Sequence, residues 1–295
     1  MGKITCANVL SDLYAIGVTE CDNMLMLLGV SEAIEPEIKN KVVQLIMKGF
    51  HDSASLAGTI VTGGQTIRNP WLLLGGVASS VSKETEILRP VNASVGDVLV
   101  LTKPLGTRPA VNAHVNFYYG QSSERRDQLS NILSESQILD CYNAAIRSMC
   151  RLNKQAATLM KKHDAHAATD VTGFGILGHA NQLAENQLNK IRFRIHSLPL
   201  LQHSFEIDTL FDYGLVRGTS AETSGGLLIA MTHNDAINFI EELSKSNDPE
   251  QAFIVGTVEA DIDSQQSPLN TQLQSNNYAF IDKDVKIISV PCKDV

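Results

Sequence analysis

The chain has 295 residues, of which 43% are hydrophobic and 19% charged, a composition typical of an ordered globular protein and too large for a mini-protein. Its 32 acidic and 24 basic side chains leave a formal charge of −8, and no dense basic run is present, which disfavours nucleic acid as a partner. No apolar stretch is long enough to span a bilayer, so a membrane protein is also disfavoured.

The first third of the chain alternates helix and strand patterns. Residues 7–17 carry apolar side chains at helical spacing and stop at a glycine, which predicts a helix. The short apolar run 22–30 is typical of a buried strand, and the periodic segment from Pro36 predicts an amphipathic helix. Further strands are predicted at about 58–62, 71–82 and 96–103, with a glycine-containing turn at 63–70 between the first two.

The segment 101–109 brings two prolines and a glycine together, and the following hundred residues shift toward helix. We therefore place a domain boundary at this segment and expect domains at 1–103 and 104–295. The later patterns predict helices at 133–163, 174–187 and 234–245, and strands at 191–196, 225–232, 252–260 and 285–290. The polar stretch 262–277 is expected to be an exposed loop. Both halves therefore indicate an α/β fold.

The run from Gly173 to Gly178 satisfies the pattern G-x-G-x-x-G of dinucleotide-binding folds. Several features weaken this interpretation. The preceding segment AHAATDVT is not a clean buried strand, and its aspartate would add charge of the same sign as a pyrophosphate. The strand at 191–196 also ends without an acidic residue for a ribose. Dinucleotide binding is therefore the weaker alternative.

Two aspartates are candidate ligands for a metal ion. Asp170 precedes glycines that open a helix, where a carboxylate and backbone amides can serve Mg²⁺ and phosphate, although it can equally be a helix cap. Asp12 lies four residues after Asn8 on one face of the predicted helix, and the alternative is that it simply points to solvent. At about 4 Å the two charges would repel by roughly 4 kcal/mol at a dielectric of 20, so a cation is expected if they converge.

Two glycine pairs are candidate ligand contacts. Gly63, Gly64, Gln65 and Thr66 follow a predicted strand, and such a turn lets the backbone approach a ligand closely, or is only a turn. The segment 222–226 offers the same two interpretations before the strand at 225–232.

Histidine and cysteine spacings do not indicate a metal site. His163 and His166 lack a third ligand, His179 is expected on a helix surface, and we assign no histidine a catalytic role. The five cysteines include no Cys-x-x-Cys pair, which is typical of reduced thiols in a cytoplasmic protein.

Several segments taken together resemble the selenophosphate synthetase (selenide, water dikinase) family, and their residues resemble its eukaryotic branch more than its bacterial one. These segments are 7–31, 63–71, 96–107, 166–180 and 222–230. The resemblance implies the two-domain fold of the ATP-binding superfamily of aminoimidazole ribonucleotide synthetase. In that superfamily the N-terminal sheets of two copies join into a barrel, so a homodimer is expected.

The resemblance also implies an activity and its site. ATP, selenide and water would give selenophosphate, AMP and phosphate, with Mg²⁺ holding the polyphosphate. By motif, Asp12 and Asp170 match metal-binding aspartates, while Asp12 and Gly63 to Thr66 match ATP contacts. The alternatives are another ATP-dependent kinase or ligase of the superfamily, such as thiamine-phosphate kinase, and a non-catalytic dimerisation partner of a complete synthetase.

The sequence departs from the family pattern at its start. Family members carry, upstream of the segment matching NVLSD, a glycine-rich stretch with a Cys or selenocysteine, a Lys and a further metal-binding Asp. This chain has no such stretch before residue 8, and Cys6 does not match the nucleophile position. We therefore expect a truncated N-terminal domain, no catalytic nucleophile within the chain, and no selenophosphate synthesis by this chain alone.

Overall fold

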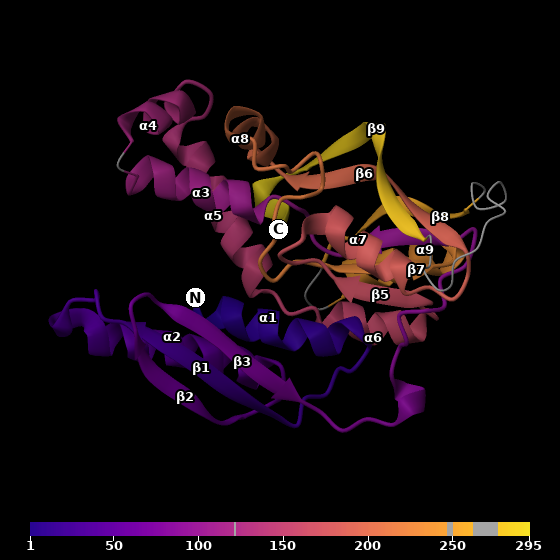
Figure 1. Ribbon diagram of the computed structural model, residues 1–295, viewed down its shortest axis with the longest axis horizontal. Coiled ribbons are helices and arrows are strands. Elements are labelled where there is room, and N and C mark those ends of the chain that lie inside the picture. Colours follow the sequence, from indigo (N-terminus) through magenta and orange to yellow (C-terminus); the bar gives the residue numbers. More distant parts are fainter. Residues whose placement is uncertain (121, 247–249, 262–276) are drawn as a thin grey trace, which may run out of the picture.

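The computed structural model describes residues 1–120, 122–246, 250–261 and 277–295, and within these ranges the strands form two sheets. The three-stranded sheet has the order β2-β1-β3, with β1 (Asn23–Ser31), β2 (Val61–Asn69) and β3 (Leu73–Ser79). The six-stranded sheet has the order β5-β7-β4-β8-β6-β9, with β4 (Val98–Leu101), β5 (Ala167–Asp170), β6 (Ile191–Leu201), β7 (Leu227–Met231), β8 (Phe253–Ala260) and β9 (Tyr278–Val290). The two sheets lie in separate halves of the molecule (Figure 1).

The helices follow the predicted mixed architecture. The first half contains α1 (Gly2–Ala15) and α2 (Pro36–Leu56). The second half contains α3 (Thr107–Tyr118), α4 (Ser123–Ser130), α5 (Glu135–Cys150), α6 (Lys154–Lys162), α7 (Gly175–Glu185), α8 (Ser204–Phe211) and α9 (His233–Ser244). The predicted helices at 133–163, 174–187 and 234–245 are confirmed as α5 with α6, α7 and α9.

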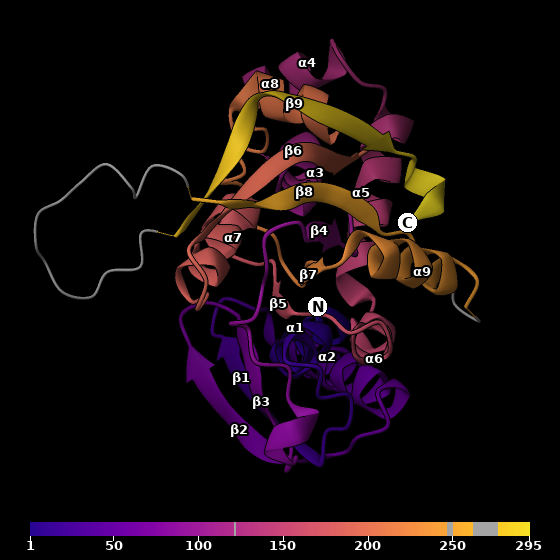
Figure 2. The same cartoon turned by 90° about the vertical axis from the view of Figure 1, so that its right-hand side faces the viewer.

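Helix α1 lies between the two halves and is buried on several sides. Its buried residues extend from Gly2 and Cys6 round to Ser11 and Ala15, which is more than half of the helix circumference. A helix that is apolar on several sides is expected between two packed layers. It packs against α2 and β3 on one side and against α5, α6 and β5 on the other (Figures 1 and 2). Polar groups on α1 therefore lie at the junction of the two halves.

The first sheet has one covered and one open face. Along β1, Met24, Met26 and Leu28 are buried beneath the helices, whereas Leu25 and Leu27 are 37% and 47% exposed, as the period of two in a strand requires. The strand registers place further apolar side chains on the same side as Leu25 and Leu27. We call this surface the open sheet face; its apolar members are Leu25, Leu27, Ile67, Leu73 and Val77.

The strand predicted at 96–103 exists as β4, but it belongs to the second sheet, where it pairs with β7 and β8. Grouping it with the first-sheet strands was wrong, and the sheets separate between Ser79 and Val98, before the predicted boundary at 103 and 104. All of β4 is buried, with alternate residues in different apolar cores. A strand buried on both faces has no polar alternation to indicate which sheet it joins.

The turn predicted at 63–70 is also wrong, because these residues form most of β2, which pairs in parallel with β1. The geometry at Gly64 explains why this strand contains glycine. Its φ is +143°, and a Cβ at this position would lie 1.8 Å from the carbonyl oxygen of Met26. Only glycine fits such a close approach between strands. The glycine pair therefore permits a strand where its composition suggested a turn.

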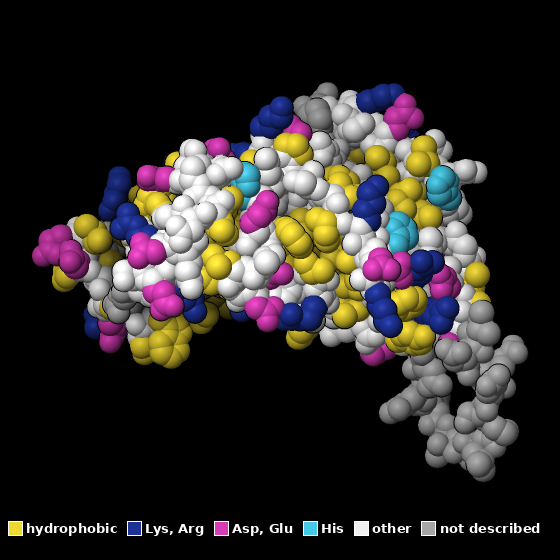
Figure 3. Space-filling view, turned by 90° about the horizontal axis from the view of Figure 1, so that it is seen from above, with side chains coloured by type: hydrophobic (Ala, Val, Ile, Leu, Met, Phe, Trp, Pro, Cys, Tyr) yellow, Lys and Arg dark blue, Asp and Glu magenta, His cyan; other side chains and the backbone are white. Residues whose placement is uncertain are grey.

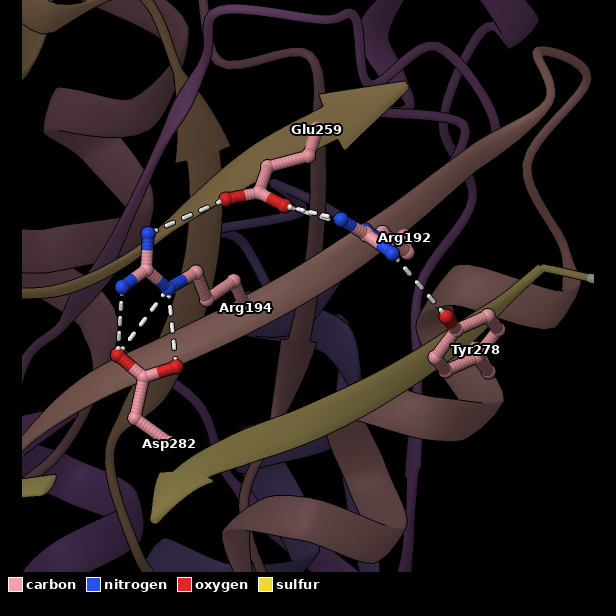
Figure 4. Close-up of polar contacts among 5 residues, drawn as sticks. All are labelled: Arg192, Arg194, Glu259, Tyr278 and Asp282. Atoms are coloured by element: carbon pink, nitrogen blue, oxygen red, sulfur yellow. Dashed lines mark hydrogen bonds and ion pairs between the residues drawn. The ribbon is translucent and has the colours of Figure 1, made fainter. Parts of the chain in front are cut away.

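The alternation predicted for 191–196 is confirmed in β6. Ile191, Phe193 and Ile195 are buried, while the intervening arginines lie on the outer side of the sheet. These arginines join β6 to its neighbours: Arg192 Nε donates to Glu259 at 3.1 Å, and Arg194 Nη2 donates to Asp282 at 2.8 Å (Figure 4). Pairs of this partly exposed kind each contribute up to about 1 kcal/mol.

The other predictions have mixed outcomes. Ala167 and Ala168 form a buried strand, β5, which the sequence did not indicate, and β5 pairs with β7 in antiparallel fashion. The parallel β-α-β unit of a dinucleotide fold is therefore not formed by β5, α7 and their partners. The predicted loop 262–277 lies outside the described residues except for Asn277.

The surface and the helices add two observations. No helix among the described residues combines the length and apolarity that crossing a bilayer requires. On the face seen in Figure 3, Lys and Arg side chains lie interspersed with Asp and Glu. The negative net charge is thus not gathered into one region on this face.

Candidate active site

Helix α1 presents a row of polar side chains to the second half of the molecule. Asn8, Ser11 and Asp12 share one face because they are three and four positions apart. The Oδ1 of Asn8 accepts the N–H of Ser224 at 3.0 Å, and the Oγ of Ser11 accepts an N–H of Asn153 at 3.1 Å. This face of α1 therefore binds the turn before β7 and the residue that precedes α6.

Asp12 and Asp170 interact where this polar face reaches the end of β5. Partial burial raises the pKa of Asp12, and the charge of Asp170 raises it further, while His179 lowers it. Burial also raises the pKa of Asp170, against the lowering effects of a hydrogen bond from Ser11 and the charge of Lys103. Two carboxyl groups from different halves of the molecule are thus close enough for the charge of one to raise the pKa of the other.

The two aspartates differ in access to solvent. Asp170 is only 8% exposed, whereas Asp12 lies at the open side of the site and is accessible. The sequence left open whether Asp12 points to solvent or contributes to a site with Asp170. In the structure Asp12 is exposed to solvent, and its pKa is also raised by the charge of Asp170. Such a site is open to a ligand on the Asp12 side.

The prediction that His179 lies on a helix surface is wrong, because the residue is 7% exposed. Its Nε2 lies 3.1 Å from Thr172 Oγ1 and accepts the N–H of Phe174 at 3.4 Å. Burial lowers the pKa of His179, which favours the neutral imidazole, and the charge of Asp12 acts in the opposite direction. Its ring lies 5.4 Å from the exposed ring of Phe174, centroid to centroid. No short sequence motif contains both His179 and Thr172 at this spacing, so this contact had no signal in the sequence.

Glu222 has a structural role that its sequence context did not reveal. Its buried carboxyl group accepts the N–H groups of Gly106 and Thr107 at 2.7 and 3.0 Å, and the Thr107 hydroxyl as well. Burial raises the pKa of Glu222 to about 7, against the lowering effect of these bonds. The carboxyl group thus occupies the N-terminus of α3, where a helix attracts negative charge.

Comparison with known proteins assigns the family. Residues 1–81 match the N-terminal domain, and residues 94–265 the C-terminal domain, of the AIR synthase related proteins. Selenide, water dikinase of Dictyostelium discoideum is 47% identical over 291 residues, which cover 98% of this chain and 77% of that protein. The chain belongs to the selenide, water dikinase family.

The other comparisons agree with this family and its fold. Human selenide, water dikinase 2 is 51% identical over 262 residues, which cover 88% of this chain but 58% of the human protein. The chain thus spans less than two thirds of that relative. Thiamine-monophosphate kinase from Stenotrophomonas maltophilia K279a has the same fold, with a TM-score of 0.67, 20% identity, and coverage of 96% of this chain and 78% of that one.

The glycine pair is not beside the aspartates in this chain. Gly63 to Thr66 lie in β2, at the edge of the first sheet farthest from β3, whereas α1 packs on the β3 side (Figures 1 and 2). They border a cavity of about 600 Å³ whose other wall includes Met47, Phe50 and His51. Gly63 and Gln65 share the open sheet face, because they pair with Leu25 and Leu27.

The donor set at the aspartate pair suits a hard cation. Among the described residues, no group of three or more His, Cys, Asp or Glu side chains is arranged to hold a metal ion. Two carboxylates nevertheless match the usual protein share of a Mg²⁺ site, because this ion keeps several waters and takes its other ligands from substrate phosphates. The repulsion that raises the pKa of Asp12 is the kind that a cation would relieve.

Proposed function

We propose that this chain is the body of a selenide, water dikinase, the enzyme that converts ATP, selenide and water to selenophosphate, AMP and phosphate. Asp12 and Asp170 would hold Mg²⁺, which neutralises phosphate charge. The observation that carries the proposal is the electrostatic contact between these two carboxyl groups at the junction of the halves. Family membership at 47% identity supplies the reaction class.

The protein groups around the aspartates suit phosphoryl transfer, which depends chiefly on positioning and charge stabilisation. Ser11 lowers the pKa of Asp170, and Asn153 donates a hydrogen bond to the Oγ of Ser11 at 3.1 Å. A neutral His179 adds no net charge beside Asp12. The chain's own residues would thus bind and orient the phosphates, with Asp12 on the solvent side.

We further propose that the functional unit is a homodimer joined through the open sheet face. Contiguous apolar side chains on one sheet face are typical of an interface. If Gly63 to Thr66 contact the nucleotide, the topology favours a contact made by a second copy, because one chain places β2 away from α1. The five free cysteines agree with a reducing compartment such as the cytoplasm.

The metal and nucleotide site can be tested by binding. Calorimetry of ATP with and without Mg²⁺ should give Mg²⁺-dependent binding to the chain, and Asp170→Asn should weaken it by roughly a hundredfold if a positioned ligand is lost. Asp284→Asn removes the same charge from an exposed position of β9 and should leave binding unchanged. Equal affinity of the Asp170 variant and the parent chain would refute the assignment of this residue.

The reaction itself can be tested in the natural protein that contains this chain. Phosphorus NMR should detect AMP and a selenophosphate resonance from ATP only when selenide is present. Thiamine phosphate, offered in place of selenide, should give no ATP turnover. Consumption of ATP with thiamine phosphate but not with selenide would instead support the kinase alternative.

A further inference from the structure

Lys103 is a buried cation held by backbone carbonyl groups. It follows β4, and its side chain is completely inaccessible to solvent. Its Nζ donates to the carbonyl oxygens of Arg151 at 2.7 Å and Ser224 at 2.9 Å. In the part of the chain that the structure describes, no Asp or Glu forms an ion pair with it. An ammonium group is costly to bury, and a methionine would fill similar volume without that cost.

The two hydrogen bonds of Lys103 join segments that meet at the aspartate pair. Arg151 is the C-cap of α5, and Ser224 lies in the turn before β7. Ser224 has a φ of +49°, a left-handed conformation that is uncommon outside glycine. Its carbonyl oxygen is bound by Lys103 while its N–H is bound by Asn8 of α1. Lys103 and Asn8 thus bind the two polar backbone groups of this one residue.

The environment of Lys103 acts on its charge in both directions. Burial lowers the pKa of Lys103 to about 7, and the Arg151 charge acts in the same direction, while the charges of Glu250, Cys150 and Asp170 raise this pKa. The two hydrogen bonds to carbonyl oxygens hold the side chain in place.

We propose that Lys103 is a positioning residue of the candidate active site, which fixes the Ser224 turn against Asn8 of α1. This inference deepens the proposed function and rests on it for the role of the site in binding. The contact with Ser224 stands independently of any ligand.

The first arm of the test measures the turn without a ligand. Hydrogen exchange of the segment 222–226 should become about tenfold faster in Lys103→Met, because a buried charged hydrogen bond is lost, while β6 keeps its protection. Lys103→Gln keeps an N–H donor without the charge and should recover part of the protection. The matched control is Lys154→Met, since Lys154 also donates to a carbonyl oxygen, that of Ala57 at 2.8 Å, but lies on α6. Unchanged exchange in the folded Lys103 variants would overturn the positioning role.

The second arm measures Mg²⁺-dependent ATP binding by the same variants. Lys103→Met should weaken it by roughly tenfold, because the turn bound by Asn8 is no longer held, and Lys103→Gln should recover part of this loss, whereas Lys154→Met should match the parent chain. Parent-like affinity in Lys103→Met would overturn the role of the turn in binding. If the parent chain itself showed no Mg²⁺-dependent binding, the proposed function would fall, and the exchange result would still decide the positioning of the turn.

Discussion

The Oδ1 of Asn8 accepts the N–H of Ser224 at 3.0 Å, across 216 positions of sequence. This bond connects the first helix to the turn that precedes a central strand of the second sheet. One apolar core also includes residues of α1, α2 and β1 together with residues of β4, β7 and α9. Because polar and apolar contacts both cross the junction, we expect the two halves to unfold in a single cooperative transition.

Asn8→Ala should destabilise the chain by about 1 kcal/mol, because the N–H of Ser224 loses its acceptor in a partly buried place. Urea unfolding followed by circular dichroism measures this difference. Asn112→Ala is the control, since the side chain of Asn112 donates a hydrogen bond within its own helix, to Arg108 O at 3.0 Å. Equal stability of the Asn8 variant and the parent chain would mean that the contact contributes nothing to the junction.

The elements with strong periodic signals were predicted well from sequence. The α2 pattern, with Pro36 at its first turn, and the alternation of β6 correspond closely to the structure. The family-specific motifs also indicated Asp12 and Asp170, which the fold brings together. Local patterns carry such information because each reflects burial of one face of one element.

What the sequence did not reveal depends on long-range contacts. The placement of β4 depends on its pairing with β7, whose residues lie more than a hundred positions away. Gly64 was assigned to a turn because glycine favours turns. In the structure, glycine is required at this position because the backbone of Met26 on the neighbouring strand leaves no room for a Cβ atom. No window of sequence contains these neighbours.

Substitution by alanine should destabilise the chain strongly at Gly64 of β2 and hardly at all at the adjacent Gly63. Gly64→Ala would put a methyl group against the Met26 carbonyl and strain a φ of +143°, so we expect a loss of more than about 2 kcal/mol. Gly63→Ala meets only Leu25 Cδ2 at 3.6 Å and should change stability by less than about 0.5 kcal/mol. Thermal unfolding of both variants measures the contrast. A tolerated alanine at Gly64 would contradict the register between β1 and β2.

Glu222→Gln should change how stability depends on pH. The folded-state pKa of Glu222, about 7, lies above its ordinary value of 4.5, so the folded protein holds the proton more tightly. The stabilisation is then complete below about pH 4.5 and is lost as pH rises toward 7. Relative to the Gln variant, the parent chain should lose up to about 3 kcal/mol over this interval.

Urea unfolding of both proteins at pH 5 and pH 7.5 tests this expectation. Glu124→Gln, at the exposed start of α4, is the control and should leave the pH dependence unaltered. A parallel pH dependence in the Glu222 variant and the parent would show that the buried carboxyl group is ionised throughout.

The open sheet face should join two copies of the chain. Leu27 and Leu73 are 47% and 56% exposed on one side of a sheet whose other side is covered by α1 and α2, and burial of such a face is a strong driving force for association. Sedimentation velocity at micromolar concentration should detect a dimer. Leu27→Glu should give a folded monomer, because each copy would bring an unpaired charge into the interface at a position that is already half-exposed in one chain. Leu188→Glu, at a 78% exposed position in the other half, should leave the dimer intact. If the parent chain sediments as a monomer throughout this range, the open sheet face does not join copies of this chain, and Gly63 to Thr66 then have no route to the aspartate pair through a second copy.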